Sequence, residues 1–251
     1  MNCAIVSCIY GKACECEESL ITLRSFSANV RPHGVKMFWI TDNMPKGMRN
    51  ECKWNGCEVI TVNDDFSANA WKQRHLWYAK LGQEWTEEFD LVLSIDAKDS
   101  CFFSNPFCLE VGDSVLVSQE ACTIGDCDWN SMDVQISQGG CRTKLDLSKE
   151  YILNGGFISA SPNLFTMFSL ARYAFDAKVG ADHSDQGSLN YLSRIVKGLV
   201  LEVPASEPWI GHGHHFAKWP QPHPDYAILH QWNRIAVPDE IRKPIIDEYG
   251  G

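Results

Sequence analysis

The sequence predicts an α/β fold in which a mostly parallel β-sheet is flanked by helices within a single domain. Short apolar runs suited to buried strands alternate with segments of helical periodicity along the first hundred residues. Such alternation produces right-handed crossovers that cover both faces of a sheet. The composition is that of a globular protein, since 45% of the 251 residues are hydrophobic and 22% are charged. A chain of this length can bury one core.

The first half of the chain carries the clearest pattern. A continuous apolar run at residues 4–9 suits a fully buried parallel strand and ends at Tyr10 and Gly11. The next apolar side chains recur at helical spacing, and a Pro-His-Gly sequence then stops the helix. The predicted elements are strands at residues 4–9, 35–41, 58–62 and 89–95, with helices at residues 19–30 and about 68–82.

Polar residues follow three of these strands directly. Tyr10 follows the first strand, Asp42 the second, and Asp96 and Asp99 the fourth. Ligands of parallel sheets bind beyond the carboxyl ends of the strands. We therefore expect these residues to gather at one edge of the sheet.

The second half is less regular. Residues 115–117 favour a strand, and residues 122–143, rich in Gly, Asp and Cys, favour a loop. Asn154-Gly155-Gly156, taken alone, is typical of a tight turn, because Asn and Gly tolerate positive φ. Ser161 is a good N-cap for a helix through about residue 177. A further helix is predicted from about residue 184, and the last 45 residues favour a loop-dominated lid or tail.

Charge and cysteine content exclude several classes of protein. A formal charge of -10 disfavours nucleic-acid binding, which depends on many Lys and Arg side chains. The 11 cysteines lack the paired spacing of structural zinc sites and indicate mostly reduced thiols. The start of the chain lacks the features of a signal peptide, and no apolar stretch reaches about 18 residues. We therefore expect a cytoplasmic protein without a transmembrane segment.

The acidic residues after the fourth strand are candidate metal ligands. Asp96 and Asp99 offer hard oxygen atoms, which suit Mg2+ or Mn2+ and, through the ion, a diphosphate. Acidic residues also commonly cap strands and make turns, so the pair alone leaves both interpretations open.

Four segments together resemble the GT-A glycosyltransferases. Phe89 to Phe107 resembles their acidic metal-binding segment, in which an apolar strand ends in a DxD or related motif. The Asp-Ala-Lys-Asp spacing is one residue longer than DxD, which leaves open whether Asp99 or only Asp96 reaches the metal. The three later matches, in the order of the family, are Leu-Asn-Gly-Gly-Phe at 153–157, Asp-Gln-Gly-Ser-Leu-Asn at 185–190 and Ala-Ile-Leu-His-Gln-Trp at 227–232.

The resemblance implies a metal-dependent glycosyltransferase that moves a sugar from a nucleotide-diphosphate sugar to the hydroxyl of a glycan, protein or small-molecule acceptor. It implies Mn2+ or Mg2+ as cofactor, with Asp96, Asp99 and His230 as ligands. The residues assigned to substrate binding are Tyr10, Asp42, Lys72, Arg74, Asn154, Gly155, Gly156 and Gln186, and those assigned to catalysis are Asp185 and Asn154.

The roles of individual residues differ. Arg74 is a better candidate for a nucleotide contact than Lys72, because a guanidinium fork suits phosphate. Asp185 would act as general base if the reaction inverts the anomeric configuration. It would stabilise the cation-like transition state together with Asn154 if the configuration is retained. The expected organisation is a nucleotide- and metal-binding half at 1–107 and a sugar and acceptor half with the C-terminal tail at 108–251.

Two other functions compete with this interpretation. The longer acidic motif fits a noncatalytic sugar- or nucleotide-binding module on the same fold. A sugar-phosphate nucleotidyltransferase shares the α/β core, but it normally opens with a glycine-rich basic segment that this chain lacks.

Two further sequence features also allow two interpretations each. The run at 212–215 suits either a zinc site or a mobile loop near the sugar pocket. Trp209, Trp219 and Trp232 suit either stacking on sugars or packing in the core.

Overall fold

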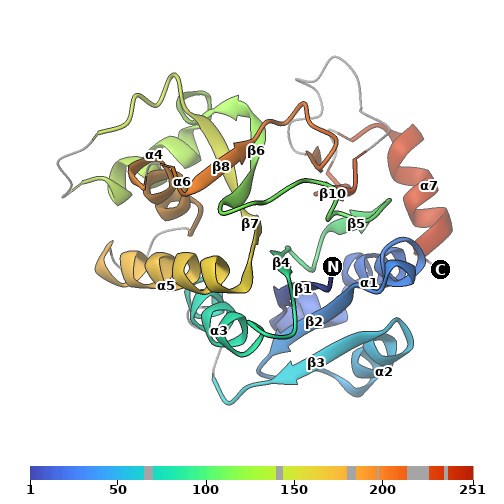
Figure 1. Ribbon diagram of the computed structural model, residues 1–251. Helices are drawn as coiled ribbons and strands as arrows, with labels where there is room; N and C mark the ends of the chain where they lie inside the picture. Colours follow the sequence, from blue (N-terminus) through green and yellow to red (C-terminus); the bar gives the residue numbers. More distant parts are fainter. Residues whose placement is uncertain are drawn as a thin grey trace.

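A twisted seven-stranded sheet forms the centre of the structure (Figure 1). The computed structural model describes residues 1–64, 70–139, 144–179, 185–196, 198–213, 226–234 and 237–250. The strand order is β3 (Cys57–Thr61), β2 (Lys36–Thr41), β1 (Cys3–Cys8), β4 (Leu91–Ser94), β7 (Tyr151–Ala160), β6 (Val115–Thr123) and β8 (Val200–Val203). Strands β3, β2, β1 and β4 are parallel, β7 is antiparallel to both neighbours, and β8 is parallel to β6. The predicted mostly parallel sheet is confirmed.

Helices cover both faces of this sheet (Figure 1). Neighbouring residues of a strand point to opposite faces, so Ile5 of β1 packs with one group of helices and Val6 with the other. The helices on the Ile5 side are α1 (Glu17–Asn29) and α2 (Lys46–Trp54), and those on the Val6 side are α3 (Ala70–Glu84), α5 (Pro162–Val179) and α6 (Asp185–Ile195).

A second, three-stranded sheet brings the end of the chain back to the acidic segment. Its order is β5 (Ser100–Phe102), β10 (Ile228–His230) and β9 (Ile210–His212). Strand β10 is antiparallel to β5 and parallel to β9, in a register that pairs His230 with both Ser100 and His212. His230 is therefore placed beside the segment that follows the fourth predicted strand.

The loop predicted at 122–143 is wrong over much of its described length. A 3-10 turn at Ile124–Asp126 leads into α4 (Asp128–Ser137). The buried face of α4 is largely polar, with Asn130, Asp133 and Ser137 beside Val134. Apolar periodicity, which was the basis for predicting helices, is therefore weak in this segment.

The loop-dominated tail is also wrong in part. Besides β9 and β10, the last 45 residues form α7 (Asp239–Tyr249), which packs on α1 through Ile245 and Tyr249. Pro244 lies inside this helix and breaks the pattern by which a helix is recognised in the sequence.

Asn154-Gly155-Gly156 is not a turn. All three residues are buried in the middle of β7, where Ser94 of β4 donates a hydrogen bond from Oγ to the Gly156 carbonyl at 2.9 Å. The pairing between β6 and β7 is irregular beside this segment, between Val117 and Gln119. Irregular pairing of this kind commonly re-aims side chains at functional sites.

Two further features concern the helices and the cysteines. Among the described residues, every helix is too short or too polar to serve as a membrane span. The ten described cysteines are all free thiols.

Candidate active site

The acidic turn after β4 is held by hydroxyl groups. Ser7 of β1 donates from Oγ to the Ile95 carbonyl at 2.7 Å and accepts from the Ala97 amide at 3.1 Å. Ser100 donates from Oγ to the Asp96 carbonyl at 2.6 Å. These bonds fix the backbone on both sides of Asp96.

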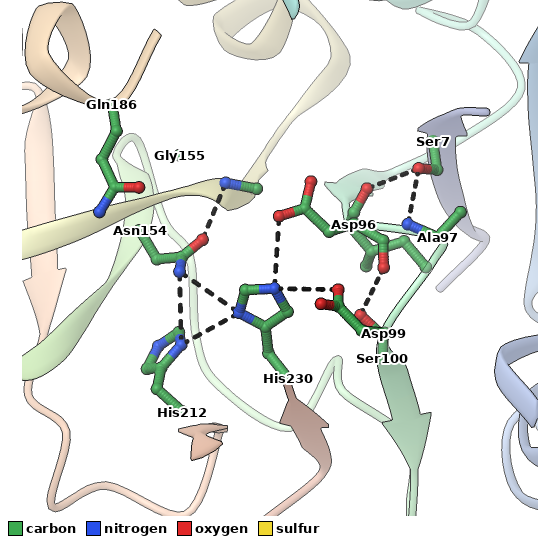
Figure 2. Close-up of polar contacts among 12 residues, drawn as sticks. Ser7, Asp96, Ala97, Asp99, Ser100, Asn154, Gly155, Gln186, His212 and His230 are labelled. Carbon is green, nitrogen blue, oxygen red and sulfur yellow. Dashed lines mark hydrogen bonds and ion pairs between the residues drawn. The ribbon is translucent and has the colours of Figure 1, made fainter. Parts of the chain in front are cut away.

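Asp96 and Asp99 converge on one imidazole. The His230 Nε2 atom lies 3.4 Å from Asp96 Oδ2 and 3.3 Å from Asp99 Oδ1 (Figure 2). The Gln231 amide donates to the Asp99 carbonyl at 2.7 Å, which ties the strand carrying His230 to the acidic turn. Residues more than 130 positions apart in the sequence therefore meet at the carboxyl end of β4.

The donor atoms of these side chains are of the kind that a small divalent cation binds. Around an ion with bonds of about 2.1 Å, ligand atoms at neighbouring octahedral corners lie roughly 3 Å apart. The nitrogen-to-oxygen distances from His230 to Asp96 and Asp99 are close to this spacing. The ring and the carboxylates contact each other directly, and in the described part of the chain no group of three His, Cys, Asp or Glu side chains is arranged to hold a metal ion as it stands.

The direct contacts shift the pKa values of Asp99 and His230. Burial alone would raise the pKa of Asp99, but the His230 imidazole and the nearby Arg234 and Lys98 outweigh it and lower that pKa. Burial alone would lower the pKa of His230, but the carboxylates of Asp99 and Asp96 outweigh it and raise that pKa. Asp99 and His230 thus stabilise each other as an ion pair.

Arg74 of α3 forms the other contact of Asp96. Its Nη1 atom donates to Asp96 Oδ1 at 3.1 Å, opposite the oxygen that faces His230. The Arg74 side chain is 14% exposed. A positive charge therefore stands beside the acidic cluster with little screening by water.

Asn154 connects His230 to a second group of polar side chains. Its Oδ1 atom accepts from the Gly156 amide at 2.9 Å, and its Nδ2 atom donates to Glu120 Oε1 at 3.0 Å. Nδ2 also lies 3.4 Å from the Nδ1 atoms of both His230 and His212 (Figure 2). Because the backbone amide and the carboxylate define the two ends of the amide group, the Asn154 side chain has one orientation.

The absence of a side chain at Gly156 leaves room for the Asp96 carboxylate. A Cβ atom added at Gly156 would lie 2.5 Å from Asp96 Oδ2 and 2.6 Å from Asp96 Cγ. Any larger residue would displace the carboxylate. The Gly155 carbonyl accepts from Nη1 of the buried Arg172 at 3.2 Å, which anchors this part of β7 to α5.

A separate cavity lies where β1 and β2 end. It has a volume of about 430 Å3 and is lined by Tyr10, Gly11, Lys12, Glu15, Asp42, Asn43 and Pro45. Tyr10 and Asp42 are therefore brought together, as their positions after parallel strands predict.

Solved structures are similar in fold to this chain along nearly its whole length, whereas no protein-family model and no curated protein sequence matches the chain. A galactosyltransferase LgtC in complex with donor and acceptor sugar analogs matches 100% of this chain and 95% of that one, with 16% identity and a TM-score of 0.62. Mouse xyloside xylosyltransferase 1, in its apo form, matches 92% of this chain and 97% of that one, with 10% identity and a TM-score of 0.57. The bifunctional glycosyltransferase WbbM matches 98% of this chain over 49% of its own, with 11% identity and a TM-score of 0.59.

The chain has the GT-A fold. At these identities the matches establish the fold, and the function is argued from the site. Within this GT-A fold the structure brings Arg74, Asp96, Asp99, Asn154 and His230 into one connected cluster.

Some predicted residues lie at the margin of this cluster. Gln186 of α6 donates from Nε2 to Glu120 Oε1 at 3.1 Å and so joins it through Glu120. Asp185 is the first residue of the same helix. Lys72 lies on α3 but forms no ion pair with the acidic cluster among the described side chains.

Sequence reasoning missed Glu120 and predicted another setting for His212, a zinc site or a mobile loop, although both residues belong to this cluster. Glu120 accepts from both Asn154 and Gln186, and nothing in the strand around it distinguishes it from a surface carboxylate. His212 belongs to β9 and is buried. Its Nε2 atom shares a hydrogen bond of 2.7 Å with Ser118 Oγ. His214 and His215 lie outside the described residues, as does Trp219.

The other two tryptophans proposed for sugar stacking pack in the core instead. Trp209 is 1% exposed and donates from Nε1 to the Pro106 carbonyl, and Trp232 is 4% exposed beside α7 residues.

Proposed function

We propose that this protein is a glycosyltransferase that moves a sugar from a nucleotide-diphosphate sugar to an acceptor hydroxyl, with Mn2+ or Mg2+ as cofactor. The observation that carries the proposal is the meeting of Asp96, Asp99 and His230 at the carboxyl end of β4. Two carboxylates and an imidazole supply the oxygen and nitrogen donors that such a cation accepts. In a GT-A fold this position faces the ligand edge of the parallel strands.

Asp96, Asp99 and His230 would hold the cation, which when bound acts as a Lewis acid that offsets the negative charge of the departing nucleoside diphosphate. Arg74 holds Asp96 in place and adds a fixed positive charge beside the carboxylates. A guanidinium group also binds phosphate oxygens in a defined geometry. The nucleotide is therefore oriented by Arg74 while Ser7 and Ser100 keep the acidic turn rigid.

The transferred sugar would lie against β7. Gly155 and Gly156 lack side chains and so allow a ligand to approach the backbone next to Asp96. Asn154 and Gln186 offer amide groups for sugar hydroxyls, and Glu120 orients both amides.

We assign Asp185 a role under either stereochemical outcome. Asp185 serves as general base if the configuration inverts. Asp185 and Asn154 stabilise the cation-like transition state if the configuration is retained.

The two halves of the chain divide the substrates between them. Residues 1–107 contribute the cavity with Tyr10 and Asp42, which we assign to the nucleoside of the donor. Residues 108–251 contribute Asn154, Gln186 and His230, on the sugar and acceptor side. The acidic turn lies between these groups, so the diphosphate would bridge the two halves.

The competing functions predict different behaviour. A noncatalytic module would bind nucleotide sugars without cleaving them. A nucleotidyltransferase would require a glycine-rich basic segment after β1, where the chain offers only Gly11 and Lys12. The ordered site around Asp96 favours catalysis of sugar transfer.

The test is a thermal-shift panel of nucleoside diphosphates and their sugars, with and without Mn2+, followed by hydrolysis assays of each sugar that binds. A ligand selective for the native state raises the melting temperature. We expect one nucleotide to bind in a Mn2+-dependent manner and its sugar to be cleaved slowly. Asp96→Ala should abolish both effects, and Asp113→Ala, a change at an exposed loop residue, should preserve them. Failure of every nucleotide to shift the wild-type protein would refute the proposal.

A further inference from the structure

A second pocket lies beside Glu120, the residue to which Asn154 donates. It has a volume of about 300 Å3 and is lined by Glu120, Cys127, Trp129, Asn130, Gln186, Gln231 and Arg234. All of these residues belong to the second half of the chain. None of them is a proposed ligand of the cation.

A continuous line of contacts joins this pocket to the acidic turn. Glu120 Oε1 lies 3.0 Å from Asn154 Nδ2, which lies 3.4 Å from His230 Nδ1. The other ring nitrogen of His230 faces Asp96 and Asp99. Gln231, the next residue in the chain, lines the pocket itself. The pocket therefore lies one layer of side chains away from the carboxylates.

Trp129 gives the pocket an aromatic wall. It is the second residue of α4, and 52% of it is exposed although it lines a cavity. Because Trp129 both lines the pocket and is half exposed, its ring face is accessible to a molecule bound there. Nothing in the sequence pattern separates Trp129 from the tryptophans that pack in the core.

Gln231 has a backbone conformation that is unusual for its residue type. Its φ of 57° is the only positive value outside glycine in the described residues. The conformation is held on both sides, because the Gln231 amide donates to the Asp99 carbonyl and its own carbonyl lies against Gly213, where a Cβ atom would approach within 2.2 Å. Such conformations cluster at ligand sites, where the surrounding structure enforces them.

We propose that this pocket binds one sugar ring of the acceptor, so that the acceptor is a carbohydrate. Trp129 would stack on the ring, and the primary amides of Asn130 and Gln231 would bind its hydroxyl groups together with Glu120. A volume of about 300 Å3 corresponds to roughly ten water molecules at about 30 Å3 each, which suits a single ring. The role of the pocket as an acceptor site depends on the proposed glycosyl transfer.

The position of the pocket distinguishes the acceptor from the donor. The donor sugar is covalently linked to the diphosphate and must lie beside Asp96, whereas Asn154 and Glu120 separate the pocket from that residue. The pocket lining also distinguishes among acceptors. A serine or threonine side chain offers one hydroxyl and would contact only part of this polar lining. A lipid chain would place apolar surface against these polar groups.

Ligand-observed saturation-transfer NMR tests the inference with the full-length protein. The probes are the methyl glycosides of common hexoses and N-acetylhexosamines, with blocked serine and threonine amides as the protein-like arm. We expect at least one methyl glycoside to bind and Trp129→Ala to weaken its Kd about tenfold. Trp129→Phe should restore part of the affinity. Trp54→Ala, which removes a Trp that is 69% exposed on α2, should leave the Kd unchanged.

Three results would overturn the acceptor assignment: no binding by any methyl glycoside, equal binding by the wild type and Trp129→Ala, or binding by the serine and threonine amides alone. If Trp129→Ala loses its far-ultraviolet circular dichroism signal, it is unfolded, and the glycoside affinities of Trp129→Phe and Gln231→Ala are compared with the wild type instead. The nucleotide thermal shift of the wild type is measured separately. A normal nucleotide shift without glycoside binding would refute the acceptor site alone, whereas a missing nucleotide shift would refute the proposed function.

Discussion

The Nδ1 atoms of His212 and His230 lie 3.4 Å apart in the interior of the protein. The two residues are paired across β9 and β10, and Ser118 Oγ holds the far nitrogen of His212 at 2.7 Å. His212 therefore supports the ring of His230 from behind, with Nε2 of His230 directed at Asp96 and Asp99. Residues behind a metal ligand fix the orientation of its ring and contribute to metal affinity.

The first prediction concerns this support. His212→Gln should keep a polar side chain in the core and weaken Mn2+ binding about ten- to hundredfold, because His230 loses its fixed orientation. Isothermal titration of the purified protein with Mn2+ gives the affinity directly. His33→Gln, at an exposed position, is the matched control and should bind Mn2+ as the wild type does. Equal affinities for both variants would show that His212 does not position His230.

The second prediction uses the glycine opposite Asp96. In Gly156→Ala the added methyl group would lie 2.5 Å from Asp96 Oδ2 and 2.6 Å from Asp96 Cγ, so the carboxylate must move. Mn2+-dependent hydrolysis of the nucleotide sugar should fall at least about tenfold, as it does when catalytic geometry is displaced by an ångström. Gly47→Ala, on α2 with no atom within 4 Å of the new Cβ, should be neutral or stabilise by up to about 1 kcal/mol. Unchanged hydrolysis in Gly156→Ala would mean that the position of Asp96 is unimportant.

The sequence was sufficient to predict those strands and helices whose hydrophobic pattern matches their burial in the fold. The strands ending near Tyr10, Asp42 and Asp96 are buried on both faces and therefore appear as continuous apolar runs. Helix α4 was missed because its buried side chains are mainly polar, and α7 because Pro244 interrupts it. Propensity rules cannot identify helices that depend on tertiary contacts of this kind.

The candidate site was predictable only in part, for a related reason. Asp96, Asp99 and His230 belong to segments that resemble a known family, so their proximity could be expected. Glu120 and His212 lie in segments without such a motif, and their roles follow from strand register and side-chain direction. If the register of either strand were predicted wrongly by one residue, these side chains would be placed on the other face of the sheet.

The third prediction separates the two basic residues of α3. Arg74 donates to Asp96, whereas Lys72 forms no ion pair with that cluster among the described side chains. Arg74→Ala should weaken binding of the nucleoside diphosphate by about ten- to hundredfold, the range expected for one charge-assisted hydrogen bond. Lys72→Ala should weaken it less than about threefold. Titration of both variants in the presence of Mn2+ measures the difference, and a larger effect of Lys72 would reverse the assignment.

The fourth prediction follows from the ion pair between His230 and Asp99. The pKa of His230 is raised in the folded protein, so its contribution to stability is complete below the unfolded value of about 6.5 and is lost as pH rises through the folded value. The pKa of Asp99 is lowered, so its contribution is present above about 3.9 and is lost as pH falls through the folded value. The pair should therefore stabilise the metal-free protein most between about pH 4 and 6.5.

Melting curves in EDTA test this window. The melting temperature of the wild type relative to His230→Gln should be highest near pH 5 to 6 and should decrease above about pH 6.5, by roughly 2–4 °C for each kcal/mol lost. Mn2+ should act in the opposite direction, because protons and the cation compete for Nε2 of His230 and metal binding strengthens as the imidazole loses its proton. The stabilisation by Mn2+ should therefore increase from pH 6 to pH 8 in the wild type and show no such increase in His230→Gln. A pH-independent effect of Mn2+ in the wild type would place the cation away from His230.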